Sequence, residues 1–172
     1  MHDTVSRRDP DRPAQSGVVA RAHLRAGRLL VNVVNMVRPR VTLGVRLLAC
    51  DAGGRVFLVR HSYLPGYHLP GGGVTPGETC QQAAIREGRE EGGLELTSPP
   101  DLFGVYLNRM LAERDHVVLF VARGASAAAR PRGLETLEAG FFDPAALPES
   151  TTPATRARVE EVLFGRTPSA DW

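Results

Sequence analysis

The most conspicuous absence in this sequence is lysine: all 21 of its lysine or arginine positions are arginine, in a chain of 172 residues. Using one cation throughout is typical of a coding bias rather than of a surface selected for polyanions. The formal net charge is only +2, so the arginines do not add up to a strongly basic protein. We therefore do not expect a nucleic-acid partner.

Cysteine and long apolar runs are scarce as well. Cys50 and Cys80 form neither a C-x-x-C pair nor a zinc-binding spacing, which favours a reduced, cytoplasmic setting. The longest apolar run, Leu29 to Val37, is interrupted by two asparagines and is far too short to span a bilayer. It lacks a small-residue cleavage site, so we do not expect a signal peptide.

The length suits one domain with a substantial core, preceded by two segments of different composition. Residues 1–17 are rich in Arg, Asp and Pro, and we expect a disordered tail. Residues 18–40 form an amphipathic N-terminal segment, in which 18–38 has the spacing of a basic amphipathic helix. Its apolar side has three candidate partners: the chain's own domain, a second subunit of a homodimer, or a membrane surface.

The remaining chain alternates strand and helix patterns, which predicts an α/β fold with a sheet covered by helices. Residues 41–50 and 55–60 are expected to form a β-hairpin around a turn at 51–54. The other expected elements are a helix at 79–91, strands at 102–108, 116–122 and 138–142, and a closing helix at 153–164.

The segment from Gly72 to Leu94 is the most informative part of the chain, with the pattern G-x5-E-x7-R-E-G-x-E-E-x-G-L. Glu87, Glu90 and Glu91 lie at positions i, i+3 and i+4, so they share one face of the expected helix. Three carboxylates on one face repel each other unless a cation lies among them. A hard ion such as Mg²⁺ prefers these oxygen ligands, which points to a metal site.

This pattern resembles the Nudix box, with one departure: Gly88 stands where an aliphatic residue is usual. The resemblance implies a Nudix-like α/β/α sandwich with a mixed central sheet over residues 41–164, followed by a C-terminal tail at 165–172. It also implies hydrolysis of a diphosphate bridge with Mg²⁺ or Mn²⁺ as cofactor. We expect Gly88 to be a tolerated departure, because this position carries no metal-binding atom. Since an interior helical glycine costs roughly 1 kcal/mol relative to alanine, we expect Gly88→Ala to stabilise the protein.

The resemblance also assigns roles to individual residues. An Arg86–Glu78 ion pair would hold the helix against the loop, and Arg86 or nearby arginines would stabilise charge on the phosphates. Glu87 would be a metal ligand or would orient the attacking water. The implied metal ligands are the Gly71 carbonyl, Glu87, Glu90 and Glu91. The implied substrate-binding residues are Gly71, Gly72, Gly73 and Tyr67.

Residues downstream of the box leave several alternatives open. The stretch 135–149 resembles the second recurring Nudix segment, and Glu138 or Glu135 would supply a further catalytic carboxylate. His116 begins an apolar strand, where a packed histidine and a substrate contact are both consistent with the pattern. The aromatic residues that flank the loop before the box are candidates for base stacking or for core packing: His61, Tyr63, Tyr67 and His68.

The function that these features favour is a metal-dependent pyrophosphohydrolase acting on a small nucleotide. Candidate substrates are nucleoside triphosphates, nucleotide sugars and dinucleoside polyphosphates. One alternative is a Nudix-fold binding or regulatory module with little turnover, although all the box carboxylates are present. Another is an RNA 5′-end pyrophosphohydrolase, which would need a basic groove that the sequence does not indicate.

Overall fold

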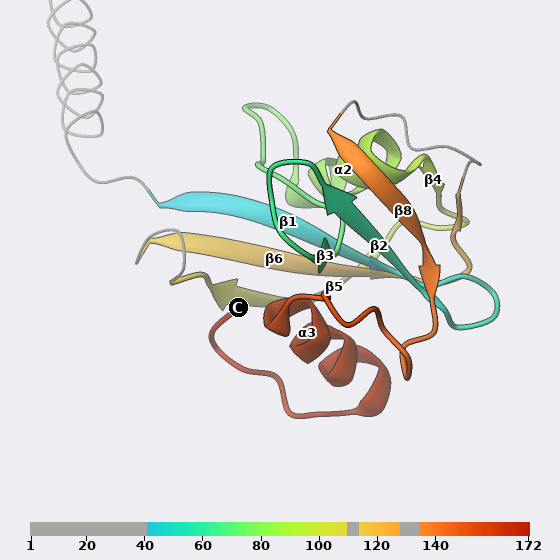
Figure 1. Ribbon diagram of the computed structural model, residues 1–172. Helices are drawn as coiled ribbons and strands as arrows, with labels where there is room; N and C mark the ends of the chain where they lie inside the picture. Colours follow the sequence, from blue (N-terminus) through green and yellow to red (C-terminus); the bar gives the residue numbers. More distant parts are fainter. Residues whose placement is uncertain (1–40, 110–113, 128–134) are drawn as a thin grey trace, which may run out of the picture. The chain divides into compact units, whose positions relative to one another are not determined.

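The computed structural model describes residues 41–109, 114–127 and 135–172 (Figure 1). The expected tail at 1–17 and the amphipathic segment at 18–40 therefore lie outside the described residues. Within the described ranges, no helix is both long and apolar enough to cross a membrane.

Three sheets form the middle of the structure. The first is mixed, since β1 pairs in parallel with β6, and β6 pairs antiparallel with β5. The second is antiparallel, in the order β3-β2-β8, and β4 with β7 forms a small third sheet. The strands are β1 (Thr42–Ala49), β2 (Val56–His61), β3 (Tyr67–His68), β4 (Leu94–Glu95), β5 (Asp101–Leu107), β6 (Asp115–Ala122), β7 (Ser126–Ala127) and β8 (Thr136–Phe142).

The prediction that the first two strands form a β-hairpin is wrong. β1 and β2 meet at an isolated bridge between Cys50 and Val56, and then enter different sheets. β1 instead pairs with β6 along its whole length, from Thr42↔Asp115 to Ala49↔Ala122. A turn between two strands is a local feature, whereas the choice of strand partner depends on residues more than 70 positions away. β5 and β6, which are consecutive in the chain, do pair with each other and run antiparallel.

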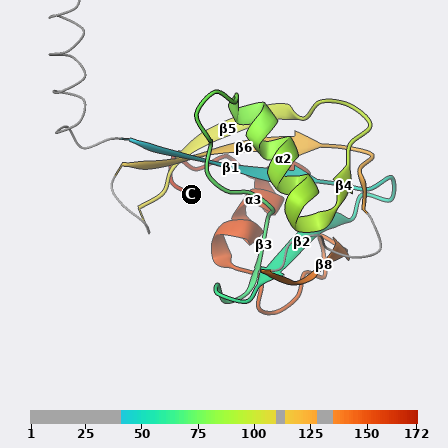
Figure 2. The ribbon, with the colours of Figure 1, turned by 90° about the horizontal axis from the view of Figure 1, so that it is seen from above.

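Two helices cover opposite faces of these strands, as both views show (Figures 1 and 2). α2 (Cys80–Gly92) covers one face and α3 (Pro153–Phe164) the other. The alternation of side chains along each strand separates two buried clusters. On β2, for example, Phe57 and Val59 face α2, while Val56 and Leu58 face α3. This arrangement confirms the α/β class and the α/β/α sandwich with a mixed sheet.

Local signals set both ends of α2. Thr79 is the N-cap and forms a capping box with Gln82, and Gly93 ends the helix in the left-handed conformation at φ 61°.

Gly88 is buried against the sheet, where a Cβ would lie 2.8 Å from Leu47 Cδ2 and 3.3 Å from Leu94 Cδ1. Leu47 and Leu94 therefore fill the space next to Gly88.

The C-terminal residues, which the sequence suggested were a tail, return along β5. The Leu107 amide donates to the Ala170 carbonyl at 2.9 Å, and the Trp172 amide donates to the Leu107 carbonyl at 3.0 Å. The Trp172 ring packs edge-on against Tyr106, with centroids 5.5 Å apart. Residues 165–172 thus cover part of the outer edge of the mixed sheet.

Candidate active site

The glycine loop before α2 runs along the edge of β1 that is not paired with β6. The Val45 amide donates to the Gly72 carbonyl at 2.8 Å, and the Val74 amide to the Leu43 carbonyl at 3.2 Å. Gly71 has φ +153°, and a Cβ there would collide with the Val45 carbonyl oxygen. The loop can therefore lie this close to β1 only with glycine at this position.

Gly72 makes room for a side chain rather than for the backbone. A Cβ built on it would lie 2.5 Å from Glu87 Oε1 and 3.0 Å from Glu87 Oε2. The missing side chain leaves room for the carboxylate that α2 presents to the loop. At Gly73, by contrast, a Cβ would meet nothing within 4 Å.

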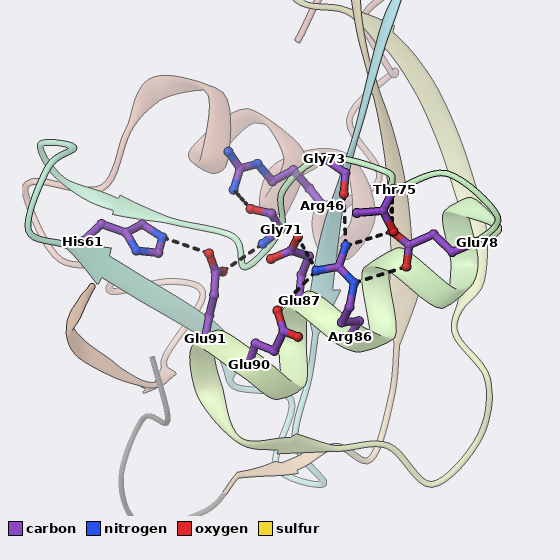
Figure 3. A network of polar contacts seen from close by, with 10 residues as sticks. All are labelled: Arg46, His61, Gly71, Gly73, Thr75, Glu78, Arg86, Glu87, Glu90 and Glu91. Carbon is purple, nitrogen blue, oxygen red and sulfur yellow. Dashed lines mark hydrogen bonds and ion pairs between the residues drawn. The ribbon is translucent and has the colours of Figure 1, made fainter. Parts of the chain in front are cut away.

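Arg86, in the middle of α2, ties the helix to the loop that precedes it (Figure 3). Its Nε donates to Glu78 Oε2 at 3.1 Å and its Nη2 to Glu78 Oε1 at 2.9 Å. Glu78 also accepts from the Thr75 amide at 2.6 Å. The hydrogen bonds from Arg86, followed by that from Thr75, lower the pKa of Glu78 to about 2, so this ion pair is fully charged at neutral pH.

Arg86 also contacts two of the three carboxylates on the shared face of α2. Its Nη1 donates to Glu87 Oε1 at 2.8 Å and to Glu90 Oε2 at 3.2 Å, and its Nη2 donates to the Gly73 carbonyl at 3.0 Å. One guanidinium therefore offsets much of the repulsion between Glu87 and Glu90.

Glu91 is held by groups from outside the helix (Figure 3). Its Oε2 accepts from the Gly71 amide at 3.0 Å, and its Oε1 lies 3.3 Å from His61 Nε2. Burial raises the pKa of Glu91 to about 7, against the opposing effects of the Gly71 hydrogen bond and of Arg46. Burial also lowers the pKa of His61, and the nearby His68 and Arg46 lower it further.

Arg46 is a site residue that sequence reasoning missed. From β1, its Nη1 donates to the Gly71 carbonyl at 2.8 Å and to the Leu69 carbonyl at 3.1 Å. It thus fixes the carbonyl group of the same glycine whose amide binds Glu91. The sequence feature that could have identified Arg46 is its place inside an apolar strand, because a charged group there is rarely buried without a partner.

Most of the residues described above line a cleft with a volume of about 1110 Å³, although Arg46 and Glu78 are not part of its lining. Residues of α2 line it together with His61, Tyr63 and the start of β8. Six of the predicted site residues line it: Gly71, Gly72, Arg86, Glu87, Glu90 and Glu91. The other lining residues are His61, Tyr63, Gln82, Ile85, Arg89, Glu135 and Thr136.

Tyr67 and Glu138 are not among the residues that line the cleft. The Tyr67 ring is buried on the α3 side, edge-on to Phe142 with centroids 5.2 Å apart. Glu138 accepts from Arg60 Nη2 at 3.2 Å on β8. Of the two downstream carboxylates considered from the sequence, the cleft contains Glu135. Tyr67 does not reach the cleft, because consecutive residues of a strand point to opposite sides of the sheet and its ring points to the α3 side.

The two other histidines considered from the sequence are also absent from the cleft lining. His68 Nε2 lies 2.9 Å from the Pro65 carbonyl oxygen. His116 is on β6, and its Nδ1 is buried without a hydrogen-bond partner in the part of the chain that the structure describes.

The donor set of the cleft suits a hard divalent cation. Glu87, Glu90, Glu91 and the Gly71 carbonyl offer only oxygen atoms, and the missing side chain of Gly72 leaves room for the Glu87 carboxylate. Across residues 41–109, 114–127 and 135–172, no three acidic, histidine or cysteine side chains already converge as a metal cluster. Arg86 contacts two of the carboxylates, so a cation would share or replace those contacts.

An acidic helix packed against a glycine loop in an α/β/α sandwich defines the class of the protein. The chain belongs to the NUDIX domain family, whose model matches residues 40–162. It is therefore a Nudix-type hydrolase that acts on phosphoanhydride bonds, as the sequence predicted.

Particular relatives agree with this assignment. A Bacillus subtilis (strain 168) protein with the name "Putative 8-oxo-dGTP diphosphatase" is 28% identical over 124 residues, which cover 72% of this chain and 81% of the relative. A MutT NUDIX hydrolase from Burkholderia pseudomallei superposes with a TM-score of 0.62 at 26% identity, covering 72% of this chain and 99% of that one. A NUDIX hydrolase from Nitrosomonas europaea shares the fold, with a TM-score of 0.59 at 22% identity and 77% coverage of both chains.

Proposed function

We propose that the protein is a divalent-metal-dependent pyrophosphohydrolase that cleaves a diphosphate bridge in a small nucleotide. The observation that carries the proposal is that Glu87, Glu90 and Glu91 line one open cleft with the glycine loop, where Glu91 binds the Gly71 amide and Glu87 lies beside Gly72. These oxygen donors would hold Mg²⁺ or Mn²⁺. A cation bound there supplies charge neutralisation for the phosphates and activates water for attack on phosphorus.

The chain's own residues would orient the reaction. Arg86 holds Glu87 and Glu90 in place, while Arg46 binds the carbonyl of Gly71 and Glu91 binds its amide. Arg89 lines the cleft and offers a cation to the phosphates. Glu135 is the downstream carboxylate best placed to accept a proton from the attacking water, since it lines the cleft and Glu138 does not.

A nucleoside triphosphate is the substrate class that we favour. The cleft is open and large enough for a mononucleotide, and Tyr63 presents an exposed ring in it that a base can stack on. The name of the Bacillus relative also points to an oxidised deoxynucleoside triphosphate.

A substrate panel tests this proposal. The purified protein would be incubated with dGTP, 8-oxo-dGTP, ADP-ribose and a dinucleoside polyphosphate, each with Mg²⁺, with Mn²⁺ or with EDTA. We expect a nucleoside monophosphate and pyrophosphate from the favoured triphosphate, and no turnover in EDTA. Hydrolysis in ¹⁸O-labelled water would identify the phosphorus that is attacked. Full activity in EDTA would contradict metal dependence, and exclusive cleavage of ADP-ribose would contradict the triphosphate.

A further inference from the structure

The three carboxylates that would bind the cation, Glu87, Glu90 and Glu91, are held in two different ways. Arg86, on the same helix, contacts Glu87 and Glu90. Glu91 receives no hydrogen bond from Arg86 among the described contacts, and both of its oxygens face groups from other parts of the chain (Figure 3). One oxygen meets the Gly71 amide, and the other lies 3.3 Å from His61 Nε2. The orientation of Glu91 therefore depends on the loop and on β2.

His61 is a rigid partner for this carboxylate. Its side chain is only 3% exposed, and it follows Phe57 and Val59 at alternate positions of β2, on the face that α2 covers. The pairing of β2 with β8 shifts by one residue between Arg60 and His61. The imidazole also stacks on Tyr63, with ring centroids 5.2 Å apart and an interplanar angle of 28°. Strand, burial and stacking together leave the ring little freedom.

The surroundings of the two ring nitrogens indicate where the proton lies. Nε2 faces the Glu91 carboxylate, whereas Nδ1 is buried without a hydrogen-bond partner among the described residues. A proton on Nδ1 would be a buried donor without an acceptor, which is costly. With its proton on Nε2, the neutral ring directs its only donor at the Glu91 carboxylate, whereas the other tautomer would turn the Nε2 lone pair toward the carboxylate oxygens.

We propose that His61 is a positioning residue for the metal site: its Nε2–H holds the Glu91 carboxylate toward the Gly71 loop, in the orientation that a divalent cation requires. The proposal rests on the metal-dependent function proposed above. Partners that orient a ligand in this way typically change metal affinity or activity by about 10- to 100-fold when they are removed.

A matched pair of amide substitutions tests the role of the Nε2 donor. In His61→Gln the side-chain amide reaches the position of Nε2, whereas in His61→Asn it is one carbon shorter and cannot. Mn²⁺ binding to the full chain, without nucleotide, would be measured by electron paramagnetic resonance of the free ion. We expect His61→Asn to weaken Mn²⁺ binding by about tenfold or more and His61→Gln to stay within about threefold of the wild type. With nucleotide, the loss in His61→Asn should appear in kcat more than in KM.

Two controls separate positioning from a general loss of structure. His68→Asn alters the neighbouring histidine, whose Nε2 contacts the Pro65 carbonyl and which does not line the cleft, and it should bind Mn²⁺ normally. In a Glu91→Gln background, His61→Asn should have no further effect on Mn²⁺ binding, because the group it orients is already changed.

Several outcomes would overturn the proposal. These are normal Mn²⁺ binding in His61→Asn, an equal loss in His61→Gln and His61→Asn, and an unchanged effect of His61→Asn in the Glu91→Gln background. The result for the wild type keeps the two proposals distinguishable. A wild-type chain that binds no Mn²⁺ would contradict the metal-dependent function and with it the role of His61. Normal wild-type binding with an unaffected His61→Asn variant would contradict the role of His61 alone.

Discussion

The guanidinium of Arg86 binds the carboxylate of Glu78 through two parallel hydrogen bonds, 3.1 Å from Nε and 2.9 Å from Nη2. Glu78 belongs to the loop and Arg86 to α2, so this fork joins the two halves of the site. The same guanidinium reaches Glu87 and Glu90. The geometry of the carboxylates thus depends on a residue that need not touch the substrate.

Arg86→Lys should therefore impair catalysis more than stability. A lysine keeps the charge but cannot form the fork, so the loop and the carboxylates lose their fixed separation. Because a displacement of about 1 Å can cost up to about 100-fold in rate, we expect kcat to fall at least about tenfold. Steady-state kinetics and thermal unfolding would be compared with Arg156→Lys, which alters an arginine on α3. Equal effects in the two variants would contradict a specific role for the fork.

Glu90→Gln and Glu91→Gln should each reduce kcat by at least about 100-fold while the fold stays intact. Each substitution keeps the shape of the side chain and removes the charge that a cation requires. Circular dichroism would check the fold, and Glu149→Gln, an exposed carboxylate outside the cleft lining, is the matched control. Near-normal rates in both cleft variants would exclude these residues as metal ligands.

Gly88→Ala is now expected to destabilise the protein, although helix propensity alone predicts a gain of up to about 1 kcal/mol. The added Cβ would lie 2.8 Å from Leu47 Cδ2, and Leu47 is completely buried. Overpacking of this kind typically costs about 1–3 kcal/mol, so we expect a net loss of roughly 1 kcal/mol in urea unfolding. Leu47→Val should recover part of that loss in the double variant. A higher melting temperature for Gly88→Ala alone would show that Leu47 can move aside.

The metal-free protein should become less stable as pH rises from 6 to 8. Burial raises the pKa of Glu91 from 4.5 to about 7. A raised pKa in the folded state contributes stability that is fully present below the unfolded value, and that is lost as pH rises through 7. The melting temperature in EDTA should therefore fall more steeply with pH for the wild type than for Glu91→Gln. If the melting temperatures of the wild type and of Glu91→Gln change equally with pH, the raised pKa of Glu91 is contradicted.

Metal affinity should change in the opposite direction over the same pH range. A cation needs Glu91 in its charged form, so Mn²⁺ should bind more tightly at pH 8 than at pH 6. The increase in melting temperature on adding Mn²⁺ should be larger at pH 8 for the same reason. An affinity that does not change with pH would argue against Glu91 as a ligand.

Two truncations would test the expectations for the N-terminal residues. Removal of 1–17 should not affect turnover, because that stretch has too few apolar residues to offset its ordering entropy. Removal of 1–38 should cause aggregation or alter the oligomeric state, since the second segment carries a row of apolar side chains. Sedimentation with and without anionic vesicles would separate domain packing, dimer and membrane surface. Packing of this segment on the domain and binding to a membrane are both contradicted under two conditions together. The chain without residues 1–38 would be soluble, monomeric and equally stable, and the full chain would not bind vesicles.

The sequence by itself determined the acidic helix and its neighbours. Helix periodicity and capping are local, so the spacing of Glu87, Glu90 and Glu91 placed them on one face, and Thr79 marked the start of α2. The closing helix was located from its pattern in the same way, at Pro153–Phe164. The box also predicted the contact between Arg86 and Glu78, which lie eight residues apart.

Only the tertiary structure decided which distant residues complete the site. His61 meets Glu91, 30 positions away, because β2 passes beside α2, and Arg46 meets Gly71 because the glycine loop follows the edge of β1. Strand pairing and the face that a strand buries depend on the whole chain rather than on a local pattern. For the same reason, β1 pairs with β6 rather than with β2, and Tyr67 packs on the α3 side of the sheet. Glu135 rather than Glu138 lines the cleft.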